Sequence, residues 1–541
     1  MSTAFLQMMA PIAGAALALG ASAGDSVHLR GEDLCRIGSI SIERHDIFGT
    51  SDSTRLRRLG TLINAIHVLT KERVIRDELL FREGEVYDPT LVEESERNLR
   101  RLGFVGDVIV HADTMPDSSI HVAVQTQDKW TLGLSTSFKQ DGGRRSYSLS
   151  VSEDNLLGSG LALSGGYNYD TQRSNPYGSE LIFSDRRVLG TRWLTKLQYK
   201  DNEDLHIKTM LLESPFFADA APWAGGLYVD EGRVRRRQYE GDVQVGQDDF
   251  WQQNQSAWLA LSATGETILR PGLAFLRART RSTTGVTARY DNLDLLHASL
   301  GIMRRTWYKG RFLNSIGRIE DVPLGFAGEV VAGRNFRSGV RQEPNWYFRL
   351  ESAAAMRCGS FYLSPALTWS GYVLGSTGTE STLQWTLLAH EQLPSRNTVV
   401  VRLTGTHGHN WSPGKQVRLG SPSGLRGYGS YQFTGEGMLL ANVEGRWRSN
   451  VEWWVFRFGG ALFFDCGVAW REEARLAAQR LHSGAGFGLR VENTKQQGTG
   501  ILRVDLAFNL DKRKFAELTI TTGQLIEAFA SIDYTPPSLA R

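Results

Sequence analysis

Residues 501–510 read Ile-Leu-Arg-Val-Asp-Leu-Ala-Phe-Asn-Leu, and this pattern decides the fold. Leu502, Val504 and Leu506 alternate with polar residues, which is the period of a β-strand that has one apolar face. The same alternation recurs from residue 130 to residue 529 without a helical period. About 400 residues of consecutive strands therefore follow one another, which is more than a single soluble β-sandwich contains.

Alternation on this scale has two explanations. A soluble sandwich turns the apolar faces of its strands inward, whereas a membrane barrel turns them outward toward lipid. A soluble region of this size would divide into smaller domains, and tandem sandwiches or a propeller would show an internal repeat, which we do not find. Aromatic residues near the expected strand ends, such as Trp193, Tyr199 and Trp369, are typical of interfacial girdles. At about 25 residues per strand and connection, we predict a 16-stranded antiparallel transmembrane β-barrel, a membrane all-β fold.

The composition excludes several other classes of protein. A formal charge of +3 gives no general reason to expect a nucleic-acid partner. The three cysteines, Cys35, Cys358 and Cys466, form no CxxC pair, which excludes a disulfide scaffold and the cysteine metal patterns. His407 and His409 lack cysteine or carboxylate companions at ligand spacing. We therefore expect neither a metal nor a cofactor.

The beginning of the chain differs from the alternating region. Residues 1–23 form an apolar segment that ends in Ala-Ser-Ala, which predicts a cleaved secretory signal peptide. Thr70 can cap a helix that continues to residue 81, and Asp88 followed by Pro89 predicts the start of a second helix. Two short alternating segments after the second helix predict a pair of strands.

These signals divide the chain into four parts. After the signal peptide, we expect one small α+β domain with an N-terminal extension over residues 24–128. The barrel follows over residues 129–529, with its last strand over residues 516–529. A tail over residues 530–541 contains two consecutive prolines and cannot continue that strand.

Two short segments stand out from the alternating background. Residues 424–428 read Gly-Leu-Arg-Gly-Tyr, and residues 463–467 read Phe-Phe-Asp-Cys-Gly. If the apolar face of the second segment meets lipid, the strand period turns Asp465 toward the lumen. A carboxylate buried there needs a partner, and a guanidinium group can bind it through two parallel hydrogen bonds.

These segments resemble motifs of the BamA/TamA-like outer-membrane protein family. The first resembles the [VI]-R-G-[FY] tip of its sixth extracellular loop, the second its F-x-D-x-G strand, and Asn-Leu-Leu-Gly-x-Gly at residues 155–160 its early-barrel motif. Residues 37–128 resemble a polypeptide-transport-associated (POTRA) domain. Leu425 departs from the family preference for valine or isoleucine, and a single POTRA-like unit fits where well-known members carry several.

The resemblance implies a set of functional residues. The loop motif comprises Gly424, Leu425, Arg426, Gly427 and Tyr428, its partner on the barrel wall comprises Phe463, Asp465 and Gly467, and the early-barrel motif comprises Asn155, Gly158 and Gly160. The loop would fold into the barrel, where Arg426 would pair with Asp465 near the seam between the first and last strands. Whether this pair acts as a switch or only as a strut remains open at this point.

The resemblance also implies a function and partners. The protein would assemble, insert or translocate polypeptides in the bacterial outer membrane, with the POTRA-like domain in the periplasm. That domain would receive an unfolded or partly folded client on a strand edge formed by Ile120, Val122 and Val124. The further partners implied are the outer-membrane bilayer, accessory lipoproteins and lipopolysaccharide, whose phosphates could meet the basic run at residues 233–237 in a solvated loop.

Two alternatives belong to other functional classes. The chain could be a passive outer-membrane pore with a vestigial periplasmic domain. It could also be an outer-membrane lipid hydrolase that uses a Ser–His pair on an outer strand face. Because the sequence contains no HExxH or paired-acid constellation, we expect no enzymatic activity.

Overall fold

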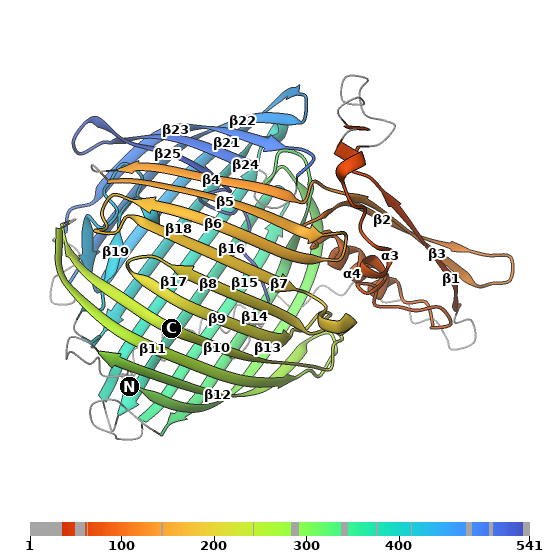
Figure 1. Cartoon of the computed structure of the whole chain (residues 1–541), viewed down its shortest axis with the longest axis horizontal. Helices are drawn as coiled ribbons and strands as arrows, with labels where there is room; N and C mark the ends of the chain where they lie inside the picture. The colour runs from red at the N-terminus through yellow and green to blue at the C-terminus, as the bar shows by residue number, and fades with distance from the viewer. Residues whose placement is uncertain are drawn as a thin grey trace.

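The computed structural model describes residues 35–48, 60–61, 63–141, 144–241, 243–282, 292–336, 345–374, 377–412, 414–471, 479–496 and 501–533. These residues form a small α+β domain and a closed β-barrel (Figure 1). The predicted signal peptide lies outside the described residues, as does the second half of the predicted tail. No helix within the described ranges is both long and apolar enough to cross a membrane.

Among the described residues, the elements with full bounds in the small domain are β1 (Ile37–His45), α3 (Glu72–Arg76), α4 (Pro89–Arg100), β2 (Val105–Thr114) and β3 (Ile120–Asp128). Its sheet has the order β1-β3-β2, with β1 parallel and β2 antiparallel to the central β3. The predicted start of the second helix is present, because Asp88 caps α4 by accepting a hydrogen bond from the Thr90 N–H.

The first predicted helix is wrong in its extent. Helix α3 spans only Glu72–Arg76, and the residue before it, Lys71, makes no side-chain cap. Thr70 does not cap the helix, because its N–H and its hydroxyl group both donate to the Asp128 carboxylate, at 2.7 and 2.8 Å. A tertiary contact with the end of β3 thus replaces the local cap.

The barrel has 20 antiparallel strands, so the predicted number of 16 is wrong. Its strands are β4 (Leu132–Asp141), β5 (Arg144–Leu156), β6 (Leu161–Asp170), β7 (Tyr177–Asp185), β8 (Leu194–Asp201), β9 (Leu205–Ser214), β10 (Trp223–Glu240), β11 (Val243–Leu261), β12 (Ile268–Ser282), β13 (Leu293–Arg311), β14 (Ile319–Asn335), β15 (Asn345–Cys358), β16 (Phe361–Leu374), β17 (Thr377–Gln392), β18 (Thr398–His409), β21 (Gly437–Trp453), β22 (Phe456–Trp470), β23 (His482–Asn493), β24 (Ile501–Asn509) and β25 (Lys514–Thr522). The prediction failed because β4–β9 have only 8–13 residues each and are joined by short turns.

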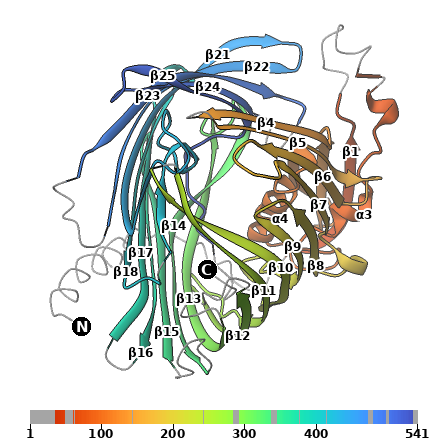
Figure 2. The ribbon, with the colours of Figure 1, turned by 60° about the vertical axis from the view of Figure 1, so that its left-hand side comes forward.

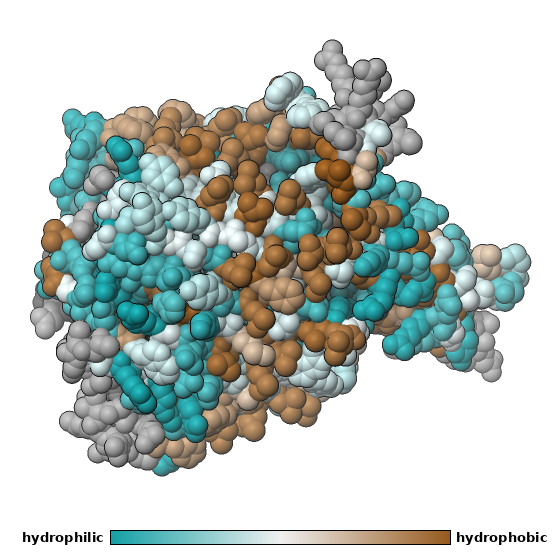
Figure 3. All heavy atoms as spheres, in the orientation of Figure 1, coloured by the Kyte–Doolittle hydropathy of each residue, from teal (hydrophilic) through white to brown (hydrophobic). Residues whose placement is uncertain are grey.

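The outer face of the barrel carries an apolar belt. Side chains on this face are widely exposed although they are apolar, including Leu259, Leu273, Leu300, Val330 and Leu462. Figure 3 shows hydrophobic residues crossing the strands between two hydrophilic ends, one of which adjoins the small domain. This distribution is the expected one for a barrel whose outer wall meets hydrocarbon.

The predicted loop at residues 233–237 is part of a strand. This segment lies in β10, where Arg235 pairs with Glu203 and Asp249, at 2.8 and 2.7 Å. Arg237 pairs with Asp204 at 2.7 Å. Two of the four arginines are therefore paired with acids of β11 and of the turn between β8 and β9.

The barrel is closed by a short pairing between its last and first strands. Strands β25 and β4 share four register pairs, from Glu517 with Asp141 to Ile520 with Phe138. By contrast, β13 and β14 share seventeen. This closure, called the seam below, is the shortest strand pairing in the barrel.

The end of the chain does not continue the wall. Strand β25 ends at Thr522 and not at residue 529 as predicted, since Gly523 adopts a φ of 85° and turns the chain away from the sheet. Ile526, Ala528 and Ile532 are then buried among inward-facing residues of β13–β18. We call residues 524–533 the inner segment.

Candidate functional site

The long loop between β18 and β21 returns into the barrel lumen. It contains β19 (Val417–Leu419), the short 3-10 turn η3 (Ser421–Ser423) and β20 (Phe433–Gly435). Gly424 and Gly427 have φ values of 115° and 87°, which glycine adopts without steric cost. Leu425 and Tyr428 are buried in a cluster with Leu419 and Leu440. The loop tip is thus packed as firmly as a protein core.

Arg426 at this tip binds the barrel wall through its whole guanidinium group. Its Nε and Nη2 atoms donate to the two carboxylate oxygens of Asp465 on β22, at 2.7 and 2.9 Å. Its Nη1 atom donates to Glu444 on β21 at 3.0 Å, and the group lies 3.4 Å from the ring centroid of Phe463. Because Arg426, Asp465 and Glu444 are almost completely buried, each charge depends on the others for compensation.

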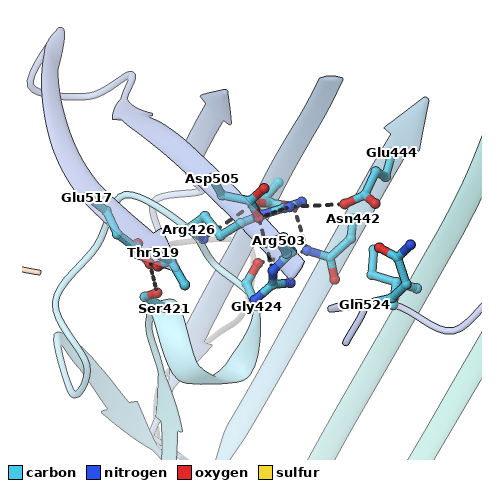
Figure 4. Close-up of polar contacts among 12 residues, drawn as sticks. Ser421, Gly424, Arg426, Asn442, Glu444, Arg503, Asp505, Glu517, Thr519 and Gln524 are labelled. Carbon is cyan, nitrogen blue, oxygen red and sulfur yellow. Dashed lines mark hydrogen bonds and ion pairs between the residues drawn. The ribbon is translucent and has the colours of Figure 1, made fainter. Parts of the chain in front are cut away.

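Further polar residues fasten the backbone of the tip. Asn442 donates to the Gly424 carbonyl oxygen and to Asp465, at 2.8 and 2.6 Å. Glu517 on β25 accepts hydrogen bonds from the Ser421 hydroxyl and from the Gly427 N–H. Figure 4 shows these groups converging on the loop from β21, β24 and β25. We call the contacts of residues 421–428 with this wall the latch.

The neighbouring glycines on the wall make room for the latch. A side chain at Gly484 would lie 2.1 Å from the Arg426 carbonyl oxygen, so the loop approaches β23 directly. Gly467, in the predicted partner motif, faces Leu419 and Leu440 of the buried cluster. The structure therefore brings the loop motif and the wall motif together.

Sequence reasoning assigned no role to Glu444, Asp505 or Glu517. Glu444 also accepts a hydrogen bond from Arg446 at 2.9 Å, and Asp505 accepts one from Arg490 at 2.6 Å. The available signal was the period of the strands, because polar residues at every second position of β21 and β24 face the lumen. The strand period predicts which side chains face the lumen but not which residues they bind there.

A polar cavity of about 340 Å³ lies between the latch and the seam. Lys139 on β4, Thr519 on β25 and Arg503 on β24 contribute to its lining, together with Arg426 and Ser421. The inner side of the seam thus borders polar, open space and not a packed core.

The early-barrel motif forms a joint between the two domains. The Asn155 side chain donates to the Thr70 hydroxyl and accepts from the Gly160 N–H, both at 2.7 Å. The Gly158 carbonyl oxygen accepts from the Lys71 N–H at 2.9 Å, and a Cβ atom on Gly158 would lie 2.5 Å from Leu69 O. The first turn of the barrel on this side therefore docks directly onto the segment before α3.

Helix α4 extends this joint around the mouth of the barrel. Arg100 donates to both carboxylate oxygens of Asp321, at 2.9 and 2.7 Å, and Asn98 donates to the Phe217 carbonyl oxygen. Glu94 accepts from the Asp219 N–H at 2.8 Å, and burial raises the pKa of its carboxyl group. Figure 1 shows α3 and α4 between the barrel and β1, and Figure 2 shows the small domain beside the barrel strands β4–β8.

The predicted client-binding edge is wrong in its placement. Ile120, Val122 and Val124 lie on β3, which is the central strand, and their side chains are part of the domain core. The sheet edges are β1 and β2. Near Ile37, the outer edge of β1 already bonds to the turn at residues 84–85.

The histidines that were considered for metal binding lie apart from other ligands. His407 stacks on Trp470 with ring centroids 6.4 Å apart. Within the described ranges, no three His, Cys, Asp or Glu side chains are grouped in a way that could hold a metal ion.

Comparison with known proteins gives three results. The model of the POTRA family, described as a surface antigen variable number repeat, matches residues 66–127. The outer membrane protein assembly factor BamA of Neorickettsia risticii is 30% identical over 108 residues, a match that spans 20% of this chain and 14% of that protein. This relative is an assembly factor.

Similar solved structures include the CdiB proteins of two bacteria. The Escherichia coli protein aligns with a TM-score of 0.46 and 11% identity, covering 96% of this chain and 98% of its own. The Acinetobacter baumannii protein aligns with a TM-score of 0.43 and 12% identity, covering 91% and 74%. BamA from Haemophilus ducreyi, lacking POTRA domains 1–3, aligns with a TM-score of 0.36 and 12% identity, covering 90% and 84%.

Proposed function

We propose that this chain, a BamA/TamA-like outer-membrane β-barrel with a POTRA domain, delivers unfolded polypeptides into or across the outer membrane. The POTRA match and the BamA relative support the family resemblance predicted from the sequence. In this proposal the POTRA domain lies in the periplasm and receives the client, while the latch closes the lumen toward the outside. Contacts with accessory lipoproteins and lipopolysaccharide belong to the same proposal.

The latch is the observation that carries this proposal. A strut needs one ion pair, but Arg426 engages two carboxylates and the face of Phe463, and Asn442 and Glu517 hold the backbone beside it. Such a network has one geometry in which all charges are compensated, so it is either closed or broken. This property suits a gate.

The seam supports a lateral route for the client. Its four register pairs leave residues 132–137 of β4 without a partner in β25. Because a polar cavity lies behind the seam, parting of the two strands would not disrupt a packed core. An unpaired strand edge is a template for a further strand, so a client strand could add to β4 there.

On the POTRA domain, β2 is the edge that we propose for the client. The edge of β2 that faces away from β3 is exposed to solvent over much of its length, and the Ile109 side chain is 47% exposed. Main-chain hydrogen bonds to such an edge bind an extended chain with little dependence on its sequence.

The alternative of a passive pore requires an open lumen. The latch occupies the outer half of the barrel and the inner segment occupies part of the other half. We therefore expect the resting protein to show low and intermittent conductance in a planar bilayer, whereas a pore would conduct steadily.

A photo-crosslinking experiment tests the proposal. A photoreactive amino acid at Ile109 should capture unfolded outer-membrane or secreted polypeptides in living cells. The same group at Met115, which is equally exposed but lies in the turn beyond β2, is the matched control. Capture of clients at neither position would contradict the proposed function.

A disulfide across the seam tests the route. Cysteines at Lys139 and Thr519, which are register partners, should block client delivery when oxidised and restore it when reduced. A control pair at Ser299 and Val331 links β13 to β14 inside the long wall and should leave delivery unchanged. Equal activity of both oxidised variants would exclude opening of the seam.

A further inference from the structure

Side chains of the barrel wall bind the backbone carbonyl oxygens of the inner segment. Arg446 on β21 donates to the Ile526 carbonyl oxygen. His390 on β17 lies 2.6 Å from the Ala528 carbonyl oxygen, and Arg305 on β13 donates to that of Ile532 at 2.9 Å. These three contacts are made to backbone atoms, so they do not depend on the side chains of the segment.

The segment packs apolar side chains against an apolar surface of the wall. Ile526, Ala528 and Ile532 are buried, and Leu525, Phe529 and Ala530 are partly buried against the same surface, while Glu527 and Ser531 are exposed. That surface is formed by residues of β14–β18 and of the turn before β14, namely Leu313, Val322, Ala355, Tyr362, Leu388 and Val400.

We propose that this surface, together with Arg305, His390 and Arg446, is a binding site for an unfolded polypeptide segment that carries several apolar residues. The inner segment occupies the site in cis and leaves it when a client enters. Unfolded barrel strands are rich in apolar side chains, and recognition of backbone carbonyl groups depends little on sequence. The inference rests on the proposed function, for which it supplies a client site within the lumen.

The position of the site agrees with this role. Arg305 also pairs with Asp219 at 2.7 Å, and the Asp219 N–H donates to Glu94 of the POTRA domain. At the other end, Arg446 contacts Glu444 of the latch. Gln524, the first residue of the segment, accepts a hydrogen bond from Arg490, which lies 3.6 Å from Glu444. The site therefore spans the distance between the POTRA joint and the latch.

A peptide-binding experiment tests the site on the full chain in detergent. The probe is a fluorescent peptide with the sequence of residues 524–533, Gln-Leu-Ile-Glu-Ala-Phe-Ala-Ser-Ile-Asp. The double variant Ile526→Asp, Ile532→Asp should release the cis segment and bind the peptide at least tenfold more tightly than the wild type, because the site is then vacant. The matched control Glu527→Asp, Ser531→Asp changes exposed positions and should bind like the wild type.

The outcomes separate the two proposals. Equal binding to the double variant and the wild type, or equal binding of a peptide that carries aspartate at both isoleucine positions, would overturn the site. Peptide binding without client capture at Ile109 would support the site and contradict the proposed function. If the double variant fails to insert, a photoreactive group at Phe529 of otherwise unchanged protein gives the same information. Its adduct to the barrel wall should decrease as peptide is added, and an unchanged adduct would overturn the proposal.

Discussion

The two segments that fill the lumen are held by different forces. The latch at residues 421–428 relies on buried charges from β21–β25, whereas the inner segment at residues 524–533 relies on apolar contacts and carbonyl groups at β13–β18. A buried charge network is specific, because removing one member leaves the others uncompensated. Apolar contacts and hydrogen bonds to backbone carbonyl groups are tolerant, because many sequences can make them. The outer closure is thus suited to a single fixed state and the inner one to exchange.

The largest effect is expected from removing the charge at the centre of the latch. Arg426→Ala leaves Asp465, Glu444 and Asp505 buried together, which should destabilise loop docking by about 3–5 kcal/mol. The protein should still insert, but it should lose client delivery, and a protease added outside should cleave the loop.

The control for this variant lies in the same loop. Arg418→Ala removes an exposed guanidinium that contacts the ring of Tyr431, so it should cost about 1 kcal/mol or less. Arg426→Lys keeps the charge but loses the two-pronged contact and should fall between them. Full delivery by Arg426→Ala would mean that the pair is only a strut.

A smaller effect should link the two closures. Glu444 contacts both Arg426 and Arg446, and Arg446 holds the inner segment, so the closures share one carboxylate. In a double-mutant cycle, Arg426→Lys and Ile526→Asp should show a coupling of about 1 kcal/mol, measured by urea unfolding in detergent. As a control, the changes in unfolding free energy caused by Arg471→Ala, at an exposed position, and by Ile526→Asp should be additive. Additivity in both cycles would show that the latch and the inner segment are independent.

The smallest effect is expected at the joint between the POTRA domain and the barrel. Asn155→Ala removes two buried hydrogen bonds and should destabilise docking by about 1–2 kcal/mol. Hydrogen exchange at residues 67–71 should rise, while Ser159→Ala in the same turn should change little. An unaltered exchange rate would show that α4 alone fixes the domain.

The acidic face of α4 allows the same joint to be tested by pH. The pKa of Glu94 is raised by burial, so its protonated form is favoured in the docked state. The stabilisation is complete below the pKa of the free carboxyl group and is lost as pH rises through the raised value. Docking should therefore tighten on acidification, and Glu94→Gln should abolish this dependence in the same exchange measurement.

The contrast between the closures also explains what the sequence can predict. The alternation from residue 130 predicted the barrel. An inward-facing Asp465 predicted a cationic partner, and Arg426 is that partner. The strand number failed because turn lengths leave no periodic signal. The inner segment was missed because its alternation of Ile526 and Ala528 looks like that of a wall strand. Only Gly523, with its left-handed backbone, separates the two, and glycines are common throughout this chain.

The turn at Gly523 has a consequence for how the molecule is made. The segment that follows it must enter the barrel before β25 closes on β4, or pass through an open end afterwards. That closure joins parts of the chain that are remote in sequence, which is intrinsically slow. An unclosed wall therefore gives the inner segment time to reach its place from the side.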